Sequence, residues 1–175
     1  MAEQFVAFAS PEYFVLLACM AVGRGLDFFS TWIATPNLLL EANPIARKMG
    51  WKFGIGINVV ICFAFALWPL PAVVVTTTSV LVAARNFQSA WLMRTMGELS
   101  YRLWMGERLA EAGRGLFVFC LGAQTVIYAF LGAVLLYFSE WRLIPFGIGM
   151  GMITFAVAVF AYSLLSVWRI ARSKL

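Results

Sequence analysis

The most restrictive feature of this chain is a series of long apolar runs with almost no charge inside them. Five such runs can be drawn, over residues 13–33, 53–68, 72–93, 116–138 and 143–168. A helix needs about 20 apolar residues to cross the hydrocarbon core of a bilayer. The runs also lack the alternation of apolar and polar residues that barrel strands need, and backbone groups in lipid must be satisfied within the protein. We therefore expect an all-α polytopic membrane helix bundle with five transmembrane helices.

Composition supports this class and leaves little room for a second domain. Hydrophobic residues make up 63% of the 175 residues, charged residues 12%, and the mean hydropathy is +0.88. Soluble domains average about 45–50% apolar and about 25% charged residues. We expect residues 1–175 to form a single integral membrane domain. A net charge of +5 would suggest nucleic acid binding in a soluble protein, but here the distribution of charge indicates membrane topology and no nucleic acid partner.

The basic residues predict how the helices are oriented. With five spans, the N-terminus, residues 69–71 and residues 139–142 share one side of the membrane and contain one basic residue, Arg142. The segments on the other side, 35–52, 94–114 and 169–175, contain ten. Because basic loops face the cytoplasm, we expect the N-terminus outside, the C-terminus inside, and segments 35–52 and 94–114 in the cytoplasm. The predicted location is the inner (plasma) membrane, with the first run retained as a helix rather than cleaved.

The segments between the runs carry their own signals. Asn43-Pro44 is typical of a helix start and Gly50 of a stop, so a short helix is expected over 44–49. The prolines of residues 68–71 predict a tight turn. Residues 93–113 have an apolar stripe at helical spacing. They are expected to continue the third helix or to lie on the membrane surface, where their arginines would contact anionic lipid headgroups; a solvated spacer and a docking helix for a partner are the alternatives.

Ionisable residues inside membrane spans are costly, so each is a candidate functional residue. Three occur here: Arg24, Asp27 and Arg85. Asp27 and Arg85 each lie about 13 or 14 residues into their runs, which puts both about 20 Å deep. We therefore expect the two side chains to contact each other, with Arg24 pairing with Asp27 along the helix. Glu41 would lie near this cluster.

These residues define one hypothetical solute- or ion-binding site. Asp27 would be its ionisable centre, and the two arginines its counter-charges or anion ligands. Thr31 and Asn43 would be neutral donors. The alternative is that the buried charges only fix helix packing, since breaking a buried pair is costly even where the intact pair gains little. The predicted site residues are Arg24, Asp27, Thr31, Glu41, Asn43 and Arg85.

Most enzyme and cofactor chemistry lacks its residues. Histidine is absent, and the cysteines stand singly in apolar runs, so haem ligation by histidine and zinc sites are not expected. There is no Gly-x-Ser-x-Gly sequence and no paired aspartate motif. We assign no catalytic residue, metal or cofactor, and an enzyme is the less favoured class. Gly147 and Gly151, four residues apart, predict a close helix contact.

Part of the chain resembles a known group of proteins. The stretch Gly25-Leu26-Asp27-Phe28-Phe29-Ser30-Thr31, followed by Glu41-Ala42-Asn43-Pro44, resembles an uncharacterised family of small prokaryotic multi-pass membrane proteins. That family carries an Asp followed by Ser/Thr in its first helix and Glu-x-Asn-Pro about 15 residues later. The resemblance covers residues 24–50 and implies that Asp27, Glu41 and Asn43 act as one unit. A basic residue often present in that family's second helix is replaced here by Asn58, and no activity comes with the resemblance.

Three functions follow in order of preference. The first is a transporter-like protein that handles a small solute, an ion or a lipid headgroup, in contact with the lipid bilayer and as a homo-oligomer. The second is a non-catalytic subunit or assembly factor of a larger membrane complex, with membrane-protein partners. The third is a membrane-embedded hydrolase or transferase.

Overall fold

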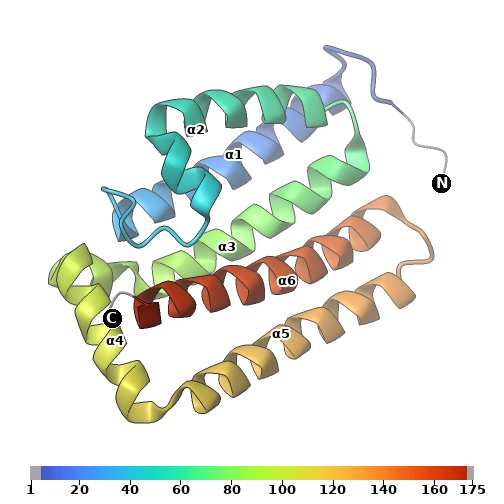
Figure 1. Cartoon of the computed structure of the whole chain (residues 1–175). Coiled ribbons are helices and arrows are strands. Elements are labelled where there is room, and N and C mark those ends of the chain that lie inside the picture. Colours follow the sequence, from blue (N-terminus) through green and yellow to red (C-terminus); the bar gives the residue numbers. More distant parts are fainter. Residues whose placement is uncertain (1–4, 173–175) are drawn as a thin grey trace.

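The computed structural model describes residues 5–172, with side chains up to residue 169, and this part of the chain is helical throughout apart from its connections (Figure 1). The helices are α1 (Pro11–Ala34), α2 (Pro44–Phe65), α3 (Pro69–Met96), α4 (Glu98–Ala112), α5 (Arg114–Tyr137) and α6 (Leu143–Arg172). All except α4 are long and apolar enough to cross a membrane. The expected all-α bundle with five candidate spans is confirmed, and the chain is a small multi-pass membrane protein.

Four of the long helices form one layer. Helix α1 packs along α3, α3 along α6, and α6 along α5. Helix α2 lies beside α1 at the edge of this layer, and α4 crosses the end of the bundle between α3 and α5 (Figure 1). Consequently α3 has two packed faces, one toward α1 and one toward α6. That division decides where its polar side chains point.

Prolines begin three of the helices. Pro11, Pro44 and Pro69 each occupy a first-turn position, where the missing N–H would have had no intrahelical partner. The tight turn expected over residues 68–71 is therefore misplaced: α3 begins at Pro69, and the chain turns over residues 66–68. Helix α2 includes the short helix that starts at Pro44 as well as the predicted second span.

In the described residues, three glycines with positive φ interrupt or separate helices on the side that the basic residues assign to the cytoplasm: Gly50, Gly97 and Gly113. Gly50, at φ 69°, interrupts α2 and separates residues 44–49 from the span, as predicted. Gly97, at φ 78°, ends α3 and begins α4, and a residue with a Cβ is disfavoured at such angles. Residues 94–114 thus form the end of α3 followed by a separate helix. On α4 the stripe residues Leu99 and Leu103 are 65% and 58% exposed.

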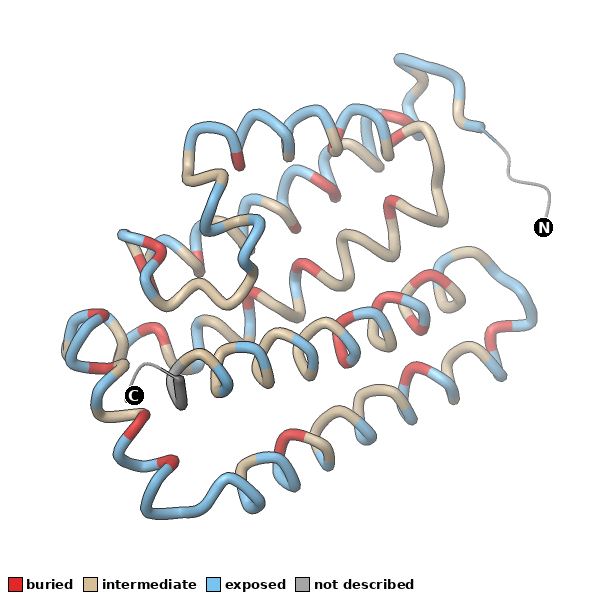
Figure 2. Tube along the Cα trace, in the orientation of Figure 1, coloured by how far each residue is buried: buried red, intermediate tan, exposed pale blue. Residues whose placement is uncertain are grey.

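Small residues let the layer pack tightly. A methyl group at Gly151 would lie 2.6 Å from Thr77 Cβ, and one at Gly147 would lie 2.6 Å from Val73 Cγ1, so α6 touches α3 through its glycines, as predicted. On its other face, Gly149 meets Gly132 of α5 at a similar distance. Buried residues follow these contact lines, and much of the outward surface is exposed (Figure 2). That surface is rich in large apolar side chains, as lipid contact requires.

Candidate functional site

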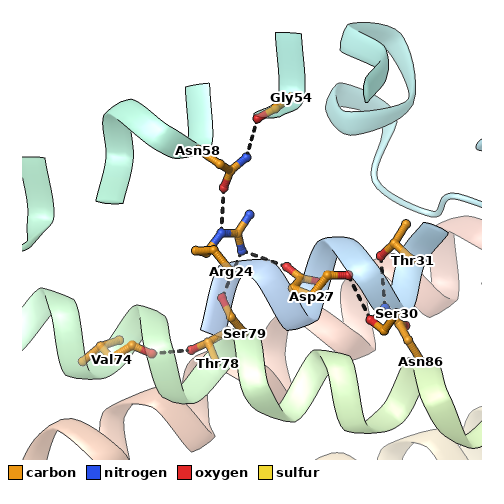
Figure 3. Close-up of polar contacts among 10 residues, drawn as sticks. All are labelled: Arg24, Asp27, Ser30, Thr31, Gly54, Asn58, Val74, Thr78, Ser79 and Asn86. Atoms are coloured by element: carbon orange, nitrogen blue, oxygen red, sulfur yellow. Dashed lines mark hydrogen bonds and ion pairs between the residues drawn. The ribbon is translucent and has the colours of Figure 1, made fainter. Parts of the chain in front are cut away.

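Arg24 of α1 connects three helices. Its Nε donates to Asn58 Oδ1 on α2 at 2.6 Å, and its Nη1 donates to Asp27 Oδ2 at 2.8 Å and to Ser79 Oγ on α3 at 3.0 Å (Figure 3). Asn58 in turn donates from Nδ2 to the Gly54 carbonyl at 2.8 Å, which directs its amide oxygen toward the guanidinium. The predicted pairing of Arg24 with Asp27 is confirmed. We call Arg24, Asp27, Asn58 and Ser79 the α1–α2–α3 site.

A second set of polar contacts joins α1 to α3 further along. Asn86 Nδ2 donates to Ser30 Oγ and to Thr31 Oγ1, both at 3.2 Å, and Ser30 Oγ donates to the Asp27 carbonyl at 2.9 Å. The pairs Arg24–Ser79 and Thr31–Asn86 have the same sequence separation of 55 residues. Helices α1 and α3 therefore run in the same direction in a constant register. Thr31, predicted as a neutral donor, here accepts a hydrogen bond.

The ion pair is only partly covered. The side chains of Arg24 and Asp27 are 25% and 18% exposed. Among the described residues, Arg24 Nη2 and Asp27 Oδ1 have no hydrogen-bond partner. Phe28 forms an apolar wall, with its ring centroid 5.8 Å from the Arg24 guanidinium and its edge against Gly54. The site therefore offers one free donor and one free acceptor next to an aromatic ring.

Glu41 lies close enough to Asp27 for their charges to interact. Burial raises the pKa of Glu41 above its ordinary value, the hydrogen bond from the Asn43 N–H opposes that rise, and the negative charge of Asp27 adds to it. Arg169 of α6 donates from Nη1 to the Glu41 carbonyl at 3.5 Å, and its charge lowers the pKa of the carboxyl. The second arginine near the two acids is thus Arg169, which sequence reasoning used only to assign topology.

Asn43 has a structural task. Its side-chain oxygen accepts from the N–H of Ile45 at 2.9 Å and from that of Ala46 at 3.4 Å, which caps α2. Its own N–H donates to Glu41 Oε1 at 2.7 Å. The Glu-x-Asn-Pro sequence therefore forms a local unit in which the acid and the cap fix each other. The side chain of Asn43 is occupied by this cap.

The direct contact expected between Asp27 and Arg85 is wrong. Arg85 Nη2 donates instead to Ser163 Oγ of α6 at 3.0 Å, and Nη1 is buried without a partner among the described residues. The depth was predicted correctly, because the register of 55 residues places Asp27 level with residue 82. The helix face was predicted wrongly. Successive residues of a helix turn by about 100°, so Arg85 does not share the α1 face of α3 with Asn86. It lies on the α6 face with Thr78, whose hydroxyl donates to the Gly151 carbonyl.

Sequence reasoning missed another acid, the buried Glu98 at the start of α4. Glu98 is 8% exposed and its carboxylate accepts four hydrogen bonds from the segment that follows α1. Oε1 accepts from Asn37 N at 2.7 Å and Asn37 Nδ2 at 3.1 Å, and Oε2 from Thr35 Oγ1 at 2.7 Å and Leu39 N at 2.8 Å. Burial would raise the pKa of Glu98, but these bonds outweigh it and lower the pKa below its ordinary value. The Thr-Pro-Asn sequence after α1 was the available signal, because such residues form turns with free backbone donors.

Comparison with known proteins adds no relationship. The chain matches no protein-family profile, no curated protein and no solved structure. The resemblance of residues 24–50 to the small prokaryotic membrane proteins therefore stays a prediction. Within residues 5–169, no three side chains among Cys, Asp and Glu come together in an arrangement that could hold a metal ion.

Proposed function

We propose that this protein resides in the inner (plasma) membrane and binds a small ion or polar solute at the α1–α2–α3 site. The observation that carries the proposal is an ion pair inside a membrane-spanning helix whose members remain 25% and 18% exposed. Ionisable residues within spans are retained at a cost, and an ion pair that served packing alone would be replaceable by apolar side chains. A partly open pair with one unbonded donor and one unbonded acceptor favours a binding role.

The chemistry of the site favours the proton as that ion. The negative charge of Asp27 raises the pKa of Glu41, together with burial, so Glu41 takes up a proton more readily than an isolated carboxyl would. Glu41 lies in the connection after α1, whereas Asp27 lies two helical turns before the end of α1 at Ala34. This order places one carboxyl near the membrane surface and the other inside the span. Asp27 is the proposed ionisable centre.

The proposed orientation brings the site toward the cytoplasm. The ends of α1 and α3, the helix α4 and the end of α6 lie on the side with ten of the basic residues, which the positive-inside rule assigns to the cytoplasm. In this orientation Glu41 exchanges protons with cytoplasmic water.

Proton flux into vesicles tests this function. The purified chain is reconstituted into liposomes loaded with the pH dye pyranine, and a potassium diffusion potential set with valinomycin drives protons across the membrane. We expect faster acidification or alkalinisation than in protein-free vesicles, and loss of this excess in Asp27→Asn. Glu12→Gln is the matched control, because it makes the same change at an exposed position in the first turn of the same helix.

Two results would count against the proposal. Wild-type vesicles that exchange protons no faster than protein-free vesicles would remove the proton as the ion. A folded Asp27→Asn protein with the wild-type rate would remove Asp27 as the ionisable centre. Helical circular dichroism and the elution volume from size exclusion establish that the variant is folded.

A different observation favours a second function, that of a subunit in a larger membrane complex. Arg85 has a buried Nη1 without a hydrogen-bond partner and no acidic side chain within ion-pair distance among the described residues. Charges inside membrane spans usually pair with one another, so an acid on a partner helix would complete this arginine. Mild solubilisation followed by mass measurement of the native assembly tests it. A hetero-complex that Arg85→Gln disrupts would support the subunit function, and a homogeneous assembly of this chain would oppose it.

A further inference from the structure

A hollow lies where the ends of α1 and α3 meet the start of α4. It has a volume of about 420 Å³, and its lining includes Ala34, Met93, Arg94, Glu98, Leu99 and Ser100. This volume lies within the range of about 300–1,000 Å³ that is usual for small-ligand sites. Apolar side chains form most of the wall, and the charged groups are Arg94 and Glu98. We call it the α1–α4 hollow.

The two charged residues of the hollow differ in their hydrogen bonding: Glu98 is fully bonded and Arg94 is not. They stand four residues apart, at the spacing of a helical ion pair, but the break at Gly97 turns the Glu98 carboxylate toward residues 35–39. Four donors surround that carboxylate, and it is 8% exposed. Arg94 forms neither an ion pair nor a hydrogen bond within the described part of the chain, and its guanidinium lies 5.6 Å from the centre of the Trp32 ring. The hollow therefore presents an unpaired cation.

Ser100 adds a second donor on the same wall. It is exposed, and its hydroxyl has no hydrogen-bond partner among residues 5–169. A guanidinium together with a hydroxyl is a donor set suited to a phosphate group, because charge-assisted hydrogen bonds from arginine to phosphate are strong and directional.

The position of the hollow indicates where such a phosphate comes from. Arg94 lies in the last turn of α3, and the exposed Trp32 and Trp91 lie near the ends of α1 and α3, as tryptophans do at membrane–water interfaces. An exposed aromatic track leads from Arg94 away from this end: Trp32 stacks on Phe29, and Phe29 meets Phe87 edge to face. The hollow is thus at headgroup level, with an apolar surface running from it toward the bilayer centre.

We infer that the α1–α4 hollow binds the headgroup of one anionic phospholipid, with its phosphate on Arg94 and Ser100 and an acyl chain along Phe29 and Phe87. This site is separate from the α1–α2–α3 site, which lies further from the helix ends and on the side of α1 that faces α2. A free anion lacks the acyl chain that this track would cover. A zwitterionic lipid carries no net charge to compensate Arg94.

Native mass spectrometry of the full chain in a neutral detergent tests the inference. With added dioleoyl phosphatidylglycerol, we expect one lipid to be retained in preference to dioleoyl phosphatidylcholine. Arg94→Gln should weaken binding of this first lipid about tenfold, the loss expected for one hydrogen bond to a charged group. Arg142→Gln is the matched control, because it removes the same charge from the α5–α6 connection, at the opposite ends of the helices. It should leave the first lipid bound.

A second variant separates shape from charge. Ser100→Phe at an exposed position fills the hollow while Arg94 and every other charge remain, and it should also weaken the first lipid. Equal binding of the two lipids by the wild-type chain, or wild-type binding by both variants, would overturn the inference. Displacement of the lipid by excess inorganic phosphate would show that the hollow binds a free anion. Absence of the lipid from a dimer peak would show that a second copy of the chain covers the hollow. Either result would overturn the lipid as occupant.

Discussion

The four hydrogen bonds to Glu98 make a sharp prediction for one substitution, Glu98→Gln. In either orientation the new NH2 group replaces an oxygen that accepts two hydrogen bonds, either from Asn37 N and Nδ2 or from Leu39 N and Thr35 Oγ1. The remaining donors meet a neutral oxygen in place of a carboxylate. Each lost bond to a charged group costs about 1.5 kcal/mol. Two lost bonds therefore lower the free energy of opening of the segment after α1 by about 3 kcal/mol, and its amides should exchange about 150-fold faster.

Hydrogen–deuterium exchange of the protein in lipid nanodiscs measures this effect. Peptides that cover residues 35–41 should exchange faster in Glu98→Gln, while peptides from α5 and α6 should not change. Glu107→Gln is the matched control, because it makes the same change on the same helix at an exposed residue. Unchanged exchange at residues 35–41 in Glu98→Gln would refute the reasoning that this carboxylate holds the segment.

The same carboxylate predicts a dependence on pH. The pKa of Glu98 is lowered in the folded chain, so its contribution to stability is fully present above the ordinary glutamate pKa of about 4.5 and is lost as the pH falls through the lower folded value. Protection of residues 35–41, corrected for intrinsic exchange, should therefore fall on acidification below about pH 4.5 in the wild type and stay flat in Glu98→Gln. Equal pH dependence in both proteins would contradict this assignment.

Three other predictions concern packing and topology. Asp27→Ala should lower the free energy of unfolding in mixed micelles by on the order of 2 kcal/mol, because Arg24 loses its partner in a partly exposed pair. The double variant Asp27→Arg with Arg85→Asp should not recover this stability, since Arg85 faces α6. Gly151→Ala should destabilise the chain by about 1–3 kcal/mol through overpacking against Thr77, whereas Gly56→Ala, which meets open space, should be neutral or stabilising; equal effects would contradict the packing. Reporters fused to the two ends should read external at the N-terminus and cytoplasmic at the C-terminus, and the same side for both would contradict five spans.

Much of the fold could be predicted because the signals are local. The apolar runs identified the spans, and the Asn43-Pro44 cap and the Gly50 break came from two or three adjacent residues. The Arg24–Asp27 pair was equally accessible, because residues three apart on a helix lie on one face. Each of these features depends on backbone geometry within one or two turns and not on which helices are neighbours.

The rest of the site depends on the order of the helices in the layer, which no local pattern contains. Asp27 and Arg85 lie at a similar depth in the bundle. However, α3 lies between α1 and α6, and Arg85 is on the face of α3 that contacts α6, not on the face that contacts α1. The spacing of Arg94 and Glu98 is that of a helical ion pair, and the break at Gly97 separates them. Arg169 reaches the Glu41 carbonyl only because the end of α6 lies beside a connection 128 residues earlier.

The parallel packing of α1 against α3 also has a consequence for how the chain is made. Two neighbouring helices that run in the same direction cannot be joined by a short hairpin, so α2 must be synthesised and must cross the membrane between them. Until α3 arrives, Arg24 lacks Ser79, and Ser30 and Thr31 lack Asn86. A ribosome-bound chain that ends after α2 therefore holds a half-built polar surface in the bilayer. An insertase or another factor that shields polar side chains from lipid would therefore act on α1 and α2 at this stage, before α3 is inserted.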